Sequence, residues 1–384
     1  WSSTYLMSFL GLGLGVGVAL YGVTRAYDLP TSAVLRALLG PLLKHQSART
    51  FLLGQKQGNL KLPPSLTQLG FTVDSDRLSK LQALLHYSGP ATFLIYLHVM
   101  ANRAVMGLFL TPDFPLSVLG GVHACTKLRL HRLLRLDESL HMEVKLAPNA
   151  RPHKRGSEVD VTTEARDGAG ALVWEATNSF IFFHKTDHSL GDIRPQVKSF
   201  KDTGRPLMHN GGKLPAGKEP AAGKKPRADT SKLVLDFEES IGRTFALISG
   251  DANPIHIGAC PARLLGFPRT VAHGMCVCGR LLPTLERVAM EELSKIRPLA
   301  SGGCRTMELS ASFLKPLIIP GSAKLRWFVD RRVNLETSVR DGLTATIRFE
   351  LCPIDAPEGT TPFQRGVFVI QEASAECSQI RANL

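Results

Sequence analysis

The sequence lacks the cysteine patterns that mark disulfide-rich and zinc-binding proteins. Its seven cysteines form no Cys-x-x-Cys pair and no recognisable framework of spacings. Cys276 and Cys278 lie too close together for an ordinary bridge and have no accompanying zinc ligands. His184 and His188 are four residues apart, but no third ligand accompanies them. We therefore expect reduced thiols, a reducing compartment and no bound metal.

Acidic residues are scarce relative to basic ones, which gives a formal net charge of +13. Nearly half of this excess falls in residues 192–232, a stretch rich in glycine, proline and lysine that has the composition of a linker. Within it, the Lys-Lys-Pro-Arg run at residues 224–227 looks like a nuclear-import cluster, but a solvated linker explains it as well. No nucleic-acid motif or interleaving of basic and aromatic residues accompanies the charge, so we expect no nucleic-acid partner.

Charge is absent from residues 5–23, a run that suits a single membrane-spanning helix. Its alternating glycines are no dinucleotide loop, because no helix with an acidic ribose ligand follows. The apolar core of a cleaved targeting sequence is the alternative. Basic residues follow the run (Arg25, Arg36, Lys44 and Arg49), which predicts that the folded part faces the cytosol. A mitochondrial or peroxisomal location is the alternative.

Two stretches of the chain have the patterns of folded domains. The expected division is an anchor at 1–24, a connector at 25–61, a first domain at 62–188, a linker at 189–232, a second domain at 233–372 and a tail at 373–384. Residues 343–351 alternate apolar and polar side chains, which predicts a strand with one buried face. A helix is predicted to begin near His273, with one apolar face formed by Leu281, Leu282, Leu285 and Val288.

The two domains also echo one another. Residues 125–146 and 307–329 both read as a strand, a turn and a second strand, so we expect two similar units packed side by side, each with its own core. Residues 94–110 are apolar enough to suggest a second membrane span. Because His98, Asn102 and Arg103 interrupt this run, we predict a buried element of the first domain instead.

The most informative stretch is residues 245–262, FALISGDANPIHIGACPA, which places Asp251, Asn253 and His256 within six positions. Gly250 permits a tight turn, and Pro254 fixes φ shortly before the histidine. A carboxylate and an imidazole held close together can grip one water and add it to a double bond by general acid–base catalysis. Taken alone, an Asp-x-Asn-Pro segment is more often a turn whose side chains cap backbone groups.

This stretch resembles the signature of the (R)-specific enoyl-CoA hydratases, the MaoC-like branch of the hot-dog fold. That signature is an aromatic, an aliphatic, then Ser/Thr-Gly-Asp-x-Asn-Pro-aliphatic-His and a small residue, here from Phe245 to Ala262. The family's second element, aliphatic-Ala-His-Gly-Met, follows at residues 271–275. The resemblance implies an α+β fold of two hot-dog units, each an antiparallel sheet wrapping a long helix, behind the membrane helix. The first unit lacks the signature; its nearest landmarks are Phe114 and the run ending at His123. It would give up catalysis and make room for an acyl chain.

The resemblance also implies roles for individual residues. Asp251 and His256 would be catalytic, the backbone N–H of Gly274 would stabilise the thioester oxyanion, and Asn253 would orient the pair or the substrate. His273 would shape the turn, and His123 would more often be structural than in contact with substrate.

The implied reaction is the hydration of a trans-2-enoyl-CoA to an (R)-3-hydroxyacyl-CoA in fatty acid metabolism, or the reverse dehydration. No cofactor is needed, because the thioester itself acidifies C2. An acyl carrier protein is the alternative carrier, which would make the protein a 3-hydroxyacyl-ACP dehydratase. Two competing functions on the same fold are non-catalytic binding of acyl thioesters, as a scaffold protein, and thioester hydrolysis. A homodimer is left open.

Overall fold

The structure is a computed structural model that describes residues 66–110, 114, 116, 121–147, 150–153, 156–183, 232–251, 253–296, 305–330, 343–357 and 359–372. The expected anchor at residues 5–23, the connector, the tail and nearly all of the linker lie outside the described residues. So do Cys304 and Cys377. The described cysteines are all free, as the sequence predicts.

The secondary structure follows the same order twice along the chain. The first half contains β1 (Leu66–Thr72), α4 (Ser75–Leu85), α5 (Thr92–Phe109), β2 (Gly121–Leu130), β3 (Ser139–Leu146), β4 (Arg151–His153), β5 (Gly156–Asp167) and β6 (Leu172–Phe183). The second half contains β7 (Lys232–Phe237), α6 (Ser240–Ser249), α7 (Pro254–Ile257), α8 (Ala259–Leu264), α9 (Gly274–Ser294), β8 (Arg305–Phe313), β9 (Gly321–Val329), β10 (Leu343–Cys352) and β11 (Gln364–Glu372). The strand–helix–helix–strands order therefore repeats, with α7 and α8 inserted only in the second half.

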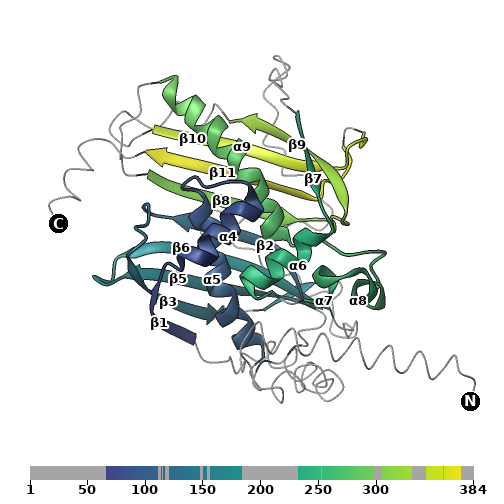
Figure 1. Ribbon diagram of the computed structural model, residues 1–384, viewed down its shortest axis with the longest axis horizontal. Coiled ribbons are helices and arrows are strands. Elements are labelled where there is room, and N and C mark those ends of the chain that lie inside the picture. Colours follow the sequence, from purple (N-terminus) through teal and green to yellow (C-terminus); the bar gives the residue numbers. More distant parts are fainter. Residues whose placement is uncertain are drawn as a thin grey trace, which may run out of the picture.

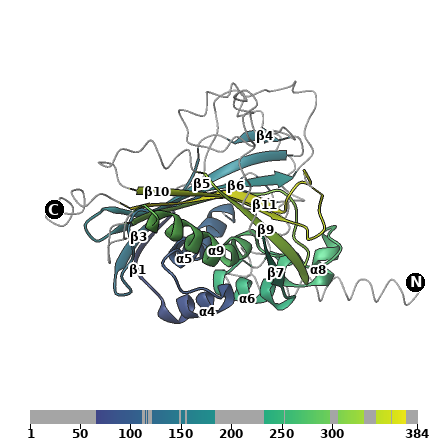
Figure 2. The same ribbon diagram turned by 90° about the horizontal axis from the view of Figure 1, so that it is seen from above.

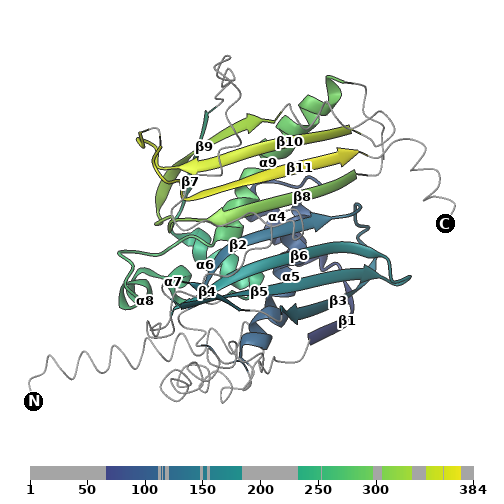
Figure 3. The same cartoon turned by 180° about the vertical axis from the view of Figure 1, so that it is seen from behind.

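All the described strands belong to one antiparallel sheet (Figure 1). Its order is β1-β3-β5-β6-β2-β8-β11-β10-β9-β7, with β4 paired to β5 at one side. The two halves meet where β2 pairs with β8, from Cys125 opposite Ser312 to Leu130 opposite Met307. Seen from behind, the strands run in this order across the molecule (Figure 3). The order reads the same from either end, so each half is an equivalent unit of the continuous sheet.

The long helices lie together on one face of the sheet (Figure 2). In α9 the predicted apolar face is buried at Leu281, Leu282, Leu285 and Val288, as expected from its spacing. Helix α5 contacts α9, α6 and several strands of the first half. A sheet that wraps one long helix in each half is the expected hot-dog arrangement.

Helix α5 contains the apolar run that could be mistaken for a membrane span. Among the described residues it is the one helix long and apolar enough to cross a membrane, and 56% of it is buried inside the protein. Leu94, Ile95 and Leu97 are fully enclosed. The helix is therefore the buried element that the sequence predicts.

The main hydrophobic core is shared between the units, which differs from the expectation of two separate cores. One cluster extends from Phe71 of the first unit to Ile370 of the second and includes residues of α5, α9, β2 and β8. A smaller cluster, which includes Phe109, Phe114 and Phe182, belongs to the first unit alone. The pairing of β2 with β8 explains the difference. It makes the two sheets continuous, so no boundary separates the apolar side chains of one unit from those of the other.

The predicted strands are found with some changes in extent. Strand β10 covers the alternating residues 343–351, and the two echoing segments form β2–β3 and β8–β9. In the region of residues 171–183, where the sequence pattern suggests separate strands at 171–176 and 179–183, one long strand, β6, is found. Helix α4 and the helical state of the apolar run 245–248, which lies in α6, were not predicted.

The units differ most in the connection between their two helices. In the first unit the turn at residues 86–91 joins α4 directly to α5, whereas residues 250–273 join α6 to α9 and carry the signature. His123 lies on β2 and is not equivalent to the signature residues. The N–H of Ala91 at the start of α5 donates to the Glu286 side chain of α9 (3.3 Å), so the helix start in the first unit already has an internal acceptor.

Candidate active site

The end of α6 sets the position of Asp251. Gly250 ends the helix with φ +72°, in the left-handed region that glycine adopts readily, and its N–H donates to the Ala246 carbonyl (2.8 Å). The Ser249 hydroxyl donates to the Phe245 carbonyl (2.7 Å) and accepts from the N–H of Asp251 (3.1 Å). These bonds turn the chain out of the helix and fix the backbone of Asp251.

The next residues orient the carboxylate of Asp251. The N–H of Asn253 donates to Oδ1 of Asp251 (3.2 Å). The side chain of Asn253 caps α7, with Oδ1 accepting from the N–H of Ile255 (3.4 Å), and Pro254 stands in the first turn. Asn253 therefore positions Asp251 through its backbone, while its side chain holds the helix that presents His256.

His256 is held with a defined tautomer. Its Nδ1 lies 2.7 Å from the Val271 carbonyl oxygen. Because a carbonyl only accepts, Nδ1 carries the hydrogen and Nε2 keeps its lone pair. The N–H of Val271 also donates to the Ile255 carbonyl (2.9 Å), which ties the two segments together. Helix α6 packs so closely behind the turn that a Cβ on Gly242 would lie 2.2 Å from the His256 carbonyl oxygen.

His273 stacks directly on the other histidine. The ring centroids of His273 and His256 are 3.8 Å apart at 29°. Nε2 of His273 lies 3.1 Å from the backbone oxygen of Asp251 and 3.7 Å from its Oδ2. The bond to the carbonyl makes Nε2 the donor. His273 therefore fixes the Asp251 backbone and supports the His256 ring, in accord with the predicted shaping role.

The charges of the site follow from burial and proximity. Burial acts to raise the pKa of Asp251, but His273, His256 and the N–H of Asn253 favour the carboxylate and bring the pKa below its ordinary value. Burial lowers the pKa of His256, although the nearby Asp251 carboxylate opposes this. Burial also lowers the pKa of His273, to about 3, and the neighbouring His256 adds to the effect. At neutral pH the site holds a carboxylate beside neutral imidazoles.

Helix α9 begins immediately after His273, which places its first turn at the site. The N–H groups of a first helical turn have no partner within the helix, and the helix dipole favours negative charge there. The side chain of Gln364 on β11 donates to the Gly274 carbonyl (3.0 Å) and anchors this turn. A Cβ on Gly274 would lie 2.7 Å from the ring of Phe313, so the ring covers the helix start closely. The N–H of Gly274 is thus a suitable donor to a developing oxyanion.

Asp251, His256 and His273 also satisfy a distance test for a metal site, since one potential ligand atom of each lies within 4.8 Å of the others. Two of the four ring nitrogens are engaged with backbone carbonyls. One of the remaining two, Nδ1 of His273, is buried and has no hydrogen-bond partner. The expectation of a metal-free site stays a prediction.

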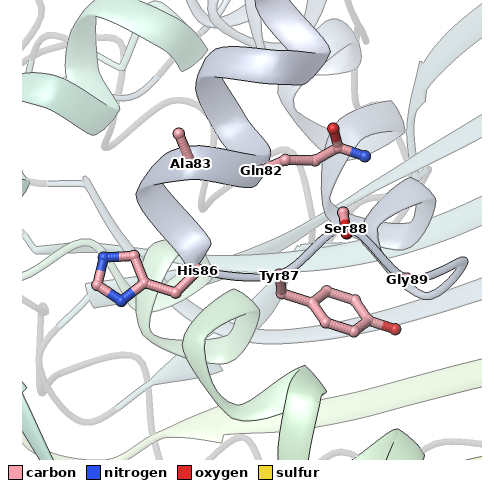
Figure 4. A pocket seen from close by; sticks show the side chains of 6 residues that line it. All are labelled: Gln82, Ala83, His86, Tyr87, Ser88 and Gly89. Carbon is pink, nitrogen blue, oxygen red and sulfur yellow. The ribbon is translucent and has the colours of Figure 1, made fainter.

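The structure brings together the sequence-predicted residues Asp251, Asn253, His256, His273 and Gly274. Sequence reasoning missed the supporting residues Gly242, Gln364 and Asn102, of which Asn102 donates through its side-chain amide to the Ser249 carbonyl (3.2 Å). Only Asn102 had a visible signal, as a polar residue inside an apolar run. A separate open hollow of about 530 Å³ lies at the end of α4 and the following turn (Figure 4). It contains none of the site residues.

Comparison with known proteins agrees with this geometry. Residues 218–339, which contain all five residues brought together here, match the model of the MaoC like domain. The chain carries a MaoC-like domain. A curated relative, 3-hydroxyacyl-thioester dehydratase X of Mycobacterium tuberculosis, is 26% identical over 232 residues, covering 60% of this chain and 68% of the relative. The domain match and this dehydratase relative identify a hydro-lyase.

Solved structures show that the fold extends beyond the matched domain. The crystal structure of HtdX from Mycobacterium tuberculosis superposes with a TM-score of 0.54 at 20% identity, covering 79% of this chain and 99% of that one. A MaoC-like dehydratase from Phytophthora capsici superposes with a TM-score of 0.51 at 15% identity, covering 82% and 97%. At these identities the likeness concerns the fold, and it includes both units of the MaoC-like architecture.

Proposed function

We propose that the protein catalyses the (R)-specific hydration of a trans-2-enoyl-CoA to an (R)-3-hydroxyacyl-CoA, or the reverse dehydration, in fatty acid metabolism. The observation that carries the proposal is the joint placement of Asp251 and His256. One carboxylate oxygen is held by the N–H of Asn253, the imidazole keeps an unprotonated Nε2, and a ring nitrogen of His256 lies within 4.8 Å of a carboxylate oxygen of Asp251. At that spacing, one water molecule can donate one hydrogen bond to the carboxylate and one to the imidazole.

The chemistry would proceed on these residues without a cofactor. A water donates one hydrogen bond to the Asp251 carboxylate and one to Nε2 of His256. As its oxygen bonds to C3, the pair takes one proton from the water and a proton is returned to C2. Negative charge that builds on the thioester oxygen would be met by the N–H of Gly274 at the start of α9. A well-placed donor of this kind contributes about 3–4 kcal/mol to the transition state.

The experiment is hydration of enoyl-CoA thioesters by the purified protein. Loss of the enoyl absorbance is followed for chains from crotonyl-CoA upward, and the product is analysed for chirality. We expect (R)-3-hydroxyacyl-CoA, formed about 10²–10⁴-fold more slowly by Asp251→Asn. An (S) product, or equal turnover by the variant, would contradict the proposal. Running the assay with acyl carrier protein thioesters identifies the carrier.

A binding or scaffold role on the same fold is the second candidate. It would retain the fold but not need both reactive groups. The free lone pair of His256 and the lowered pKa of Asp251 favour catalysis over binding alone. Tight binding of acyl-CoA without any turnover would favour the scaffold.

We also propose that residues 5–23 tether these units to a membrane, with the folded part in the cytosol. The support is the uncharged sequence and the basic residues that follow it. Resistance of the full chain to alkaline carbonate extraction, and release on deletion of residues 1–24, is the expected result. Extraction of the full chain would contradict the tether.

A further inference from the structure

The first unit places polar side chains against the catalytic turn. Asn102 on α5 donates through its side-chain amide to the Ser249 carbonyl (3.2 Å), two residues before Asp251. His98 lies one helical turn earlier, on the same face of α5. Two of the three residues that interrupt the apolar run of this helix, His98 and Asn102, thus lie on the side of the site, whereas Arg103 is exposed.

His98 is paired with a histidine from the sheet. The rings of His98 and His123 are parallel, with centroids 5.7 Å apart at 4°. A β-bulge in β2 lies between His123 and Cys125, where the pairing with β6 shifts by one residue. Bulges of this kind re-aim a side chain, here onto α5. We call His98 and His123 the histidine wall.

The histidine wall continues to the start of α9. The ring of His123 lies 4.9 Å from that of Phe313, and Phe313 covers Gly274. On the other side His123 stacks on Phe180 of β6 (4.8 Å, 17°). The Asp251 carboxylate acts electrostatically on both histidines. The wall therefore borders the site from the side of the first unit.

In each ring of the wall, one nitrogen has no hydrogen-bond partner. Nδ1 of His98 and Nε2 of His123 are buried and lack a hydrogen-bond partner, and His98 is only 8% exposed. Burial, together with His123, lowers the pKa of His98 to about 3, and burial lowers the pKa of His123 to about 4. Both rings are neutral at neutral pH, so the unpartnered nitrogen of each is either an N–H donor or a lone-pair acceptor, according to the tautomer. Buried polar groups in proteins are satisfied by protein, water or ligand.

We propose that the histidine wall binds an oxygen substituent on the acyl chain of the substrate, beyond C3. The inference rests on the proposed function and adds a substrate class to it: enoyl thioesters whose chain bears a hydroxyl or carbonyl group. A plain hydrocarbon chain would leave both nitrogens unsatisfied. An oxygen on the chain would supply a hydrogen-bond partner that the protein itself does not give them. Loss of one buried hydrogen-bond partner corresponds to about a tenfold change in affinity.

The test compares matched substrates on the full chain. Hydration of trans-2-octenoyl-CoA is measured beside that of its 5-, 6- and 7-hydroxy derivatives. We expect one hydroxy derivative to exceed the plain chain by at least about tenfold in kcat/KM. His98→Leu and His123→Leu, two separate variants, should each abolish that preference and raise kcat/KM for the plain chain. His141→Leu, an exposed histidine on β3, should keep the preference.

Binding separates this proposal from the proposed reaction. Calorimetry with octanoyl-CoA and its 5-, 6- and 7-hydroxy derivatives reads the preference without turnover. A preference in binding without hydration would refute the reaction and retain the wall. Hydration with equal kcat/KM for plain and hydroxylated chains would refute the binding role of the histidine wall and leave the proposed reaction intact. Equal losses of kcat/KM for both chain types in the two wall variants would show that the histidines have a structural role, and would also refute the binding role.

Discussion

Removing the carboxylate of Asp251 tests the central pair most directly. In Asp251→Asn the new side-chain oxygen can still accept from the N–H of Asn253, and the backbone carbonyl can still accept from His273. The bonds that shape the turn therefore survive. What changes is the other side-chain atom, which becomes an NH2 donor facing the water instead of an acceptor.

The size of the effect follows from that single change. A positioned acid or base contributes about 10²–10⁴-fold, or about 3–5 kcal/mol of activation free energy. We expect kcat to fall by this amount while KM changes little, because the acyl and CoA portions still bind. His256→Ala should have a similar effect. Since both residues act on one water, the double variant should be little worse than either single one.

The assay is hydration of the best enoyl-CoA substrate, with circular dichroism and thermal unfolding to check the fold. Asp355→Asn and His141→Ala change the same residue types at exposed positions and serve as controls. They should retain full turnover. If the losses in kcat of the two single variants multiply in the double variant, the argument that both residues act on one water is refuted, even if each single loss is large.

Further predictions concern packing, pH and metals. Gly242→Ala should lower kcat by at least about tenfold, because the added Cβ would lie 2.2 Å from the His256 carbonyl oxygen. Gly258→Ala is the control and should be tolerated, because its Cβ would meet nothing closer than 3.8 Å. Steady-state kinetics measure both variants, and equal activities would contradict the packing argument. Burial lowers the pKa of His256, and the neutral ring is the form that accepts a proton. We therefore expect kcat/KM to rise with pH through a midpoint below 6.5, the ordinary pKa of histidine, and a midpoint above 6.5 would contradict this assignment. The folded-state pKa values of His98 and His273, about 3, lie below their unfolded value of 6.5, so folding favours the neutral rings: stability is complete above pH 6.5 and is lost as pH falls toward 3. Urea unfolding at pH 7.5 and pH 5 measures this, and greater stability at pH 5 would contradict it. Prolonged treatment with EDTA should leave turnover unchanged, and loss of activity restored by one divalent metal would show that the three-residue cluster holds an ion.

The sequence predicted which residues come together at the site better than it predicted the residues that support them. Asp251, Asn253 and His256 lie within one turn, so a local pattern was enough to place them together. Asn102 and Gln364 reach the site from other elements, and their contacts with Ser249 and Gly274 span 147 and 90 residues. No periodicity encodes such contacts.

The fold was predicted where local periodicity decides it. The apolar face of α9 and the alternation in β10 were visible because burial on one face imposes a spacing. The shared core was not visible, because it depends on the pairing of β2 with β8 between distant segments. The bulge that turns His123 toward α5 is likewise set by pairing with β6 and has no signal of its own.

The joining of two units in one chain removes a constraint of symmetry. In a homodimer of identical hot-dog subunits, every substitution appears twice, once beside each site. Here His98 and Asn102 occur only in the unit that borders the site, and the long connection at 250–273 occurs only in the unit that contains it. Each unit can therefore diverge for a single task. A change on α5 can alter the surroundings of the turn that carries Asp251 and His256 without altering a second, equivalent turn, and selection can act on the two halves of the gene separately.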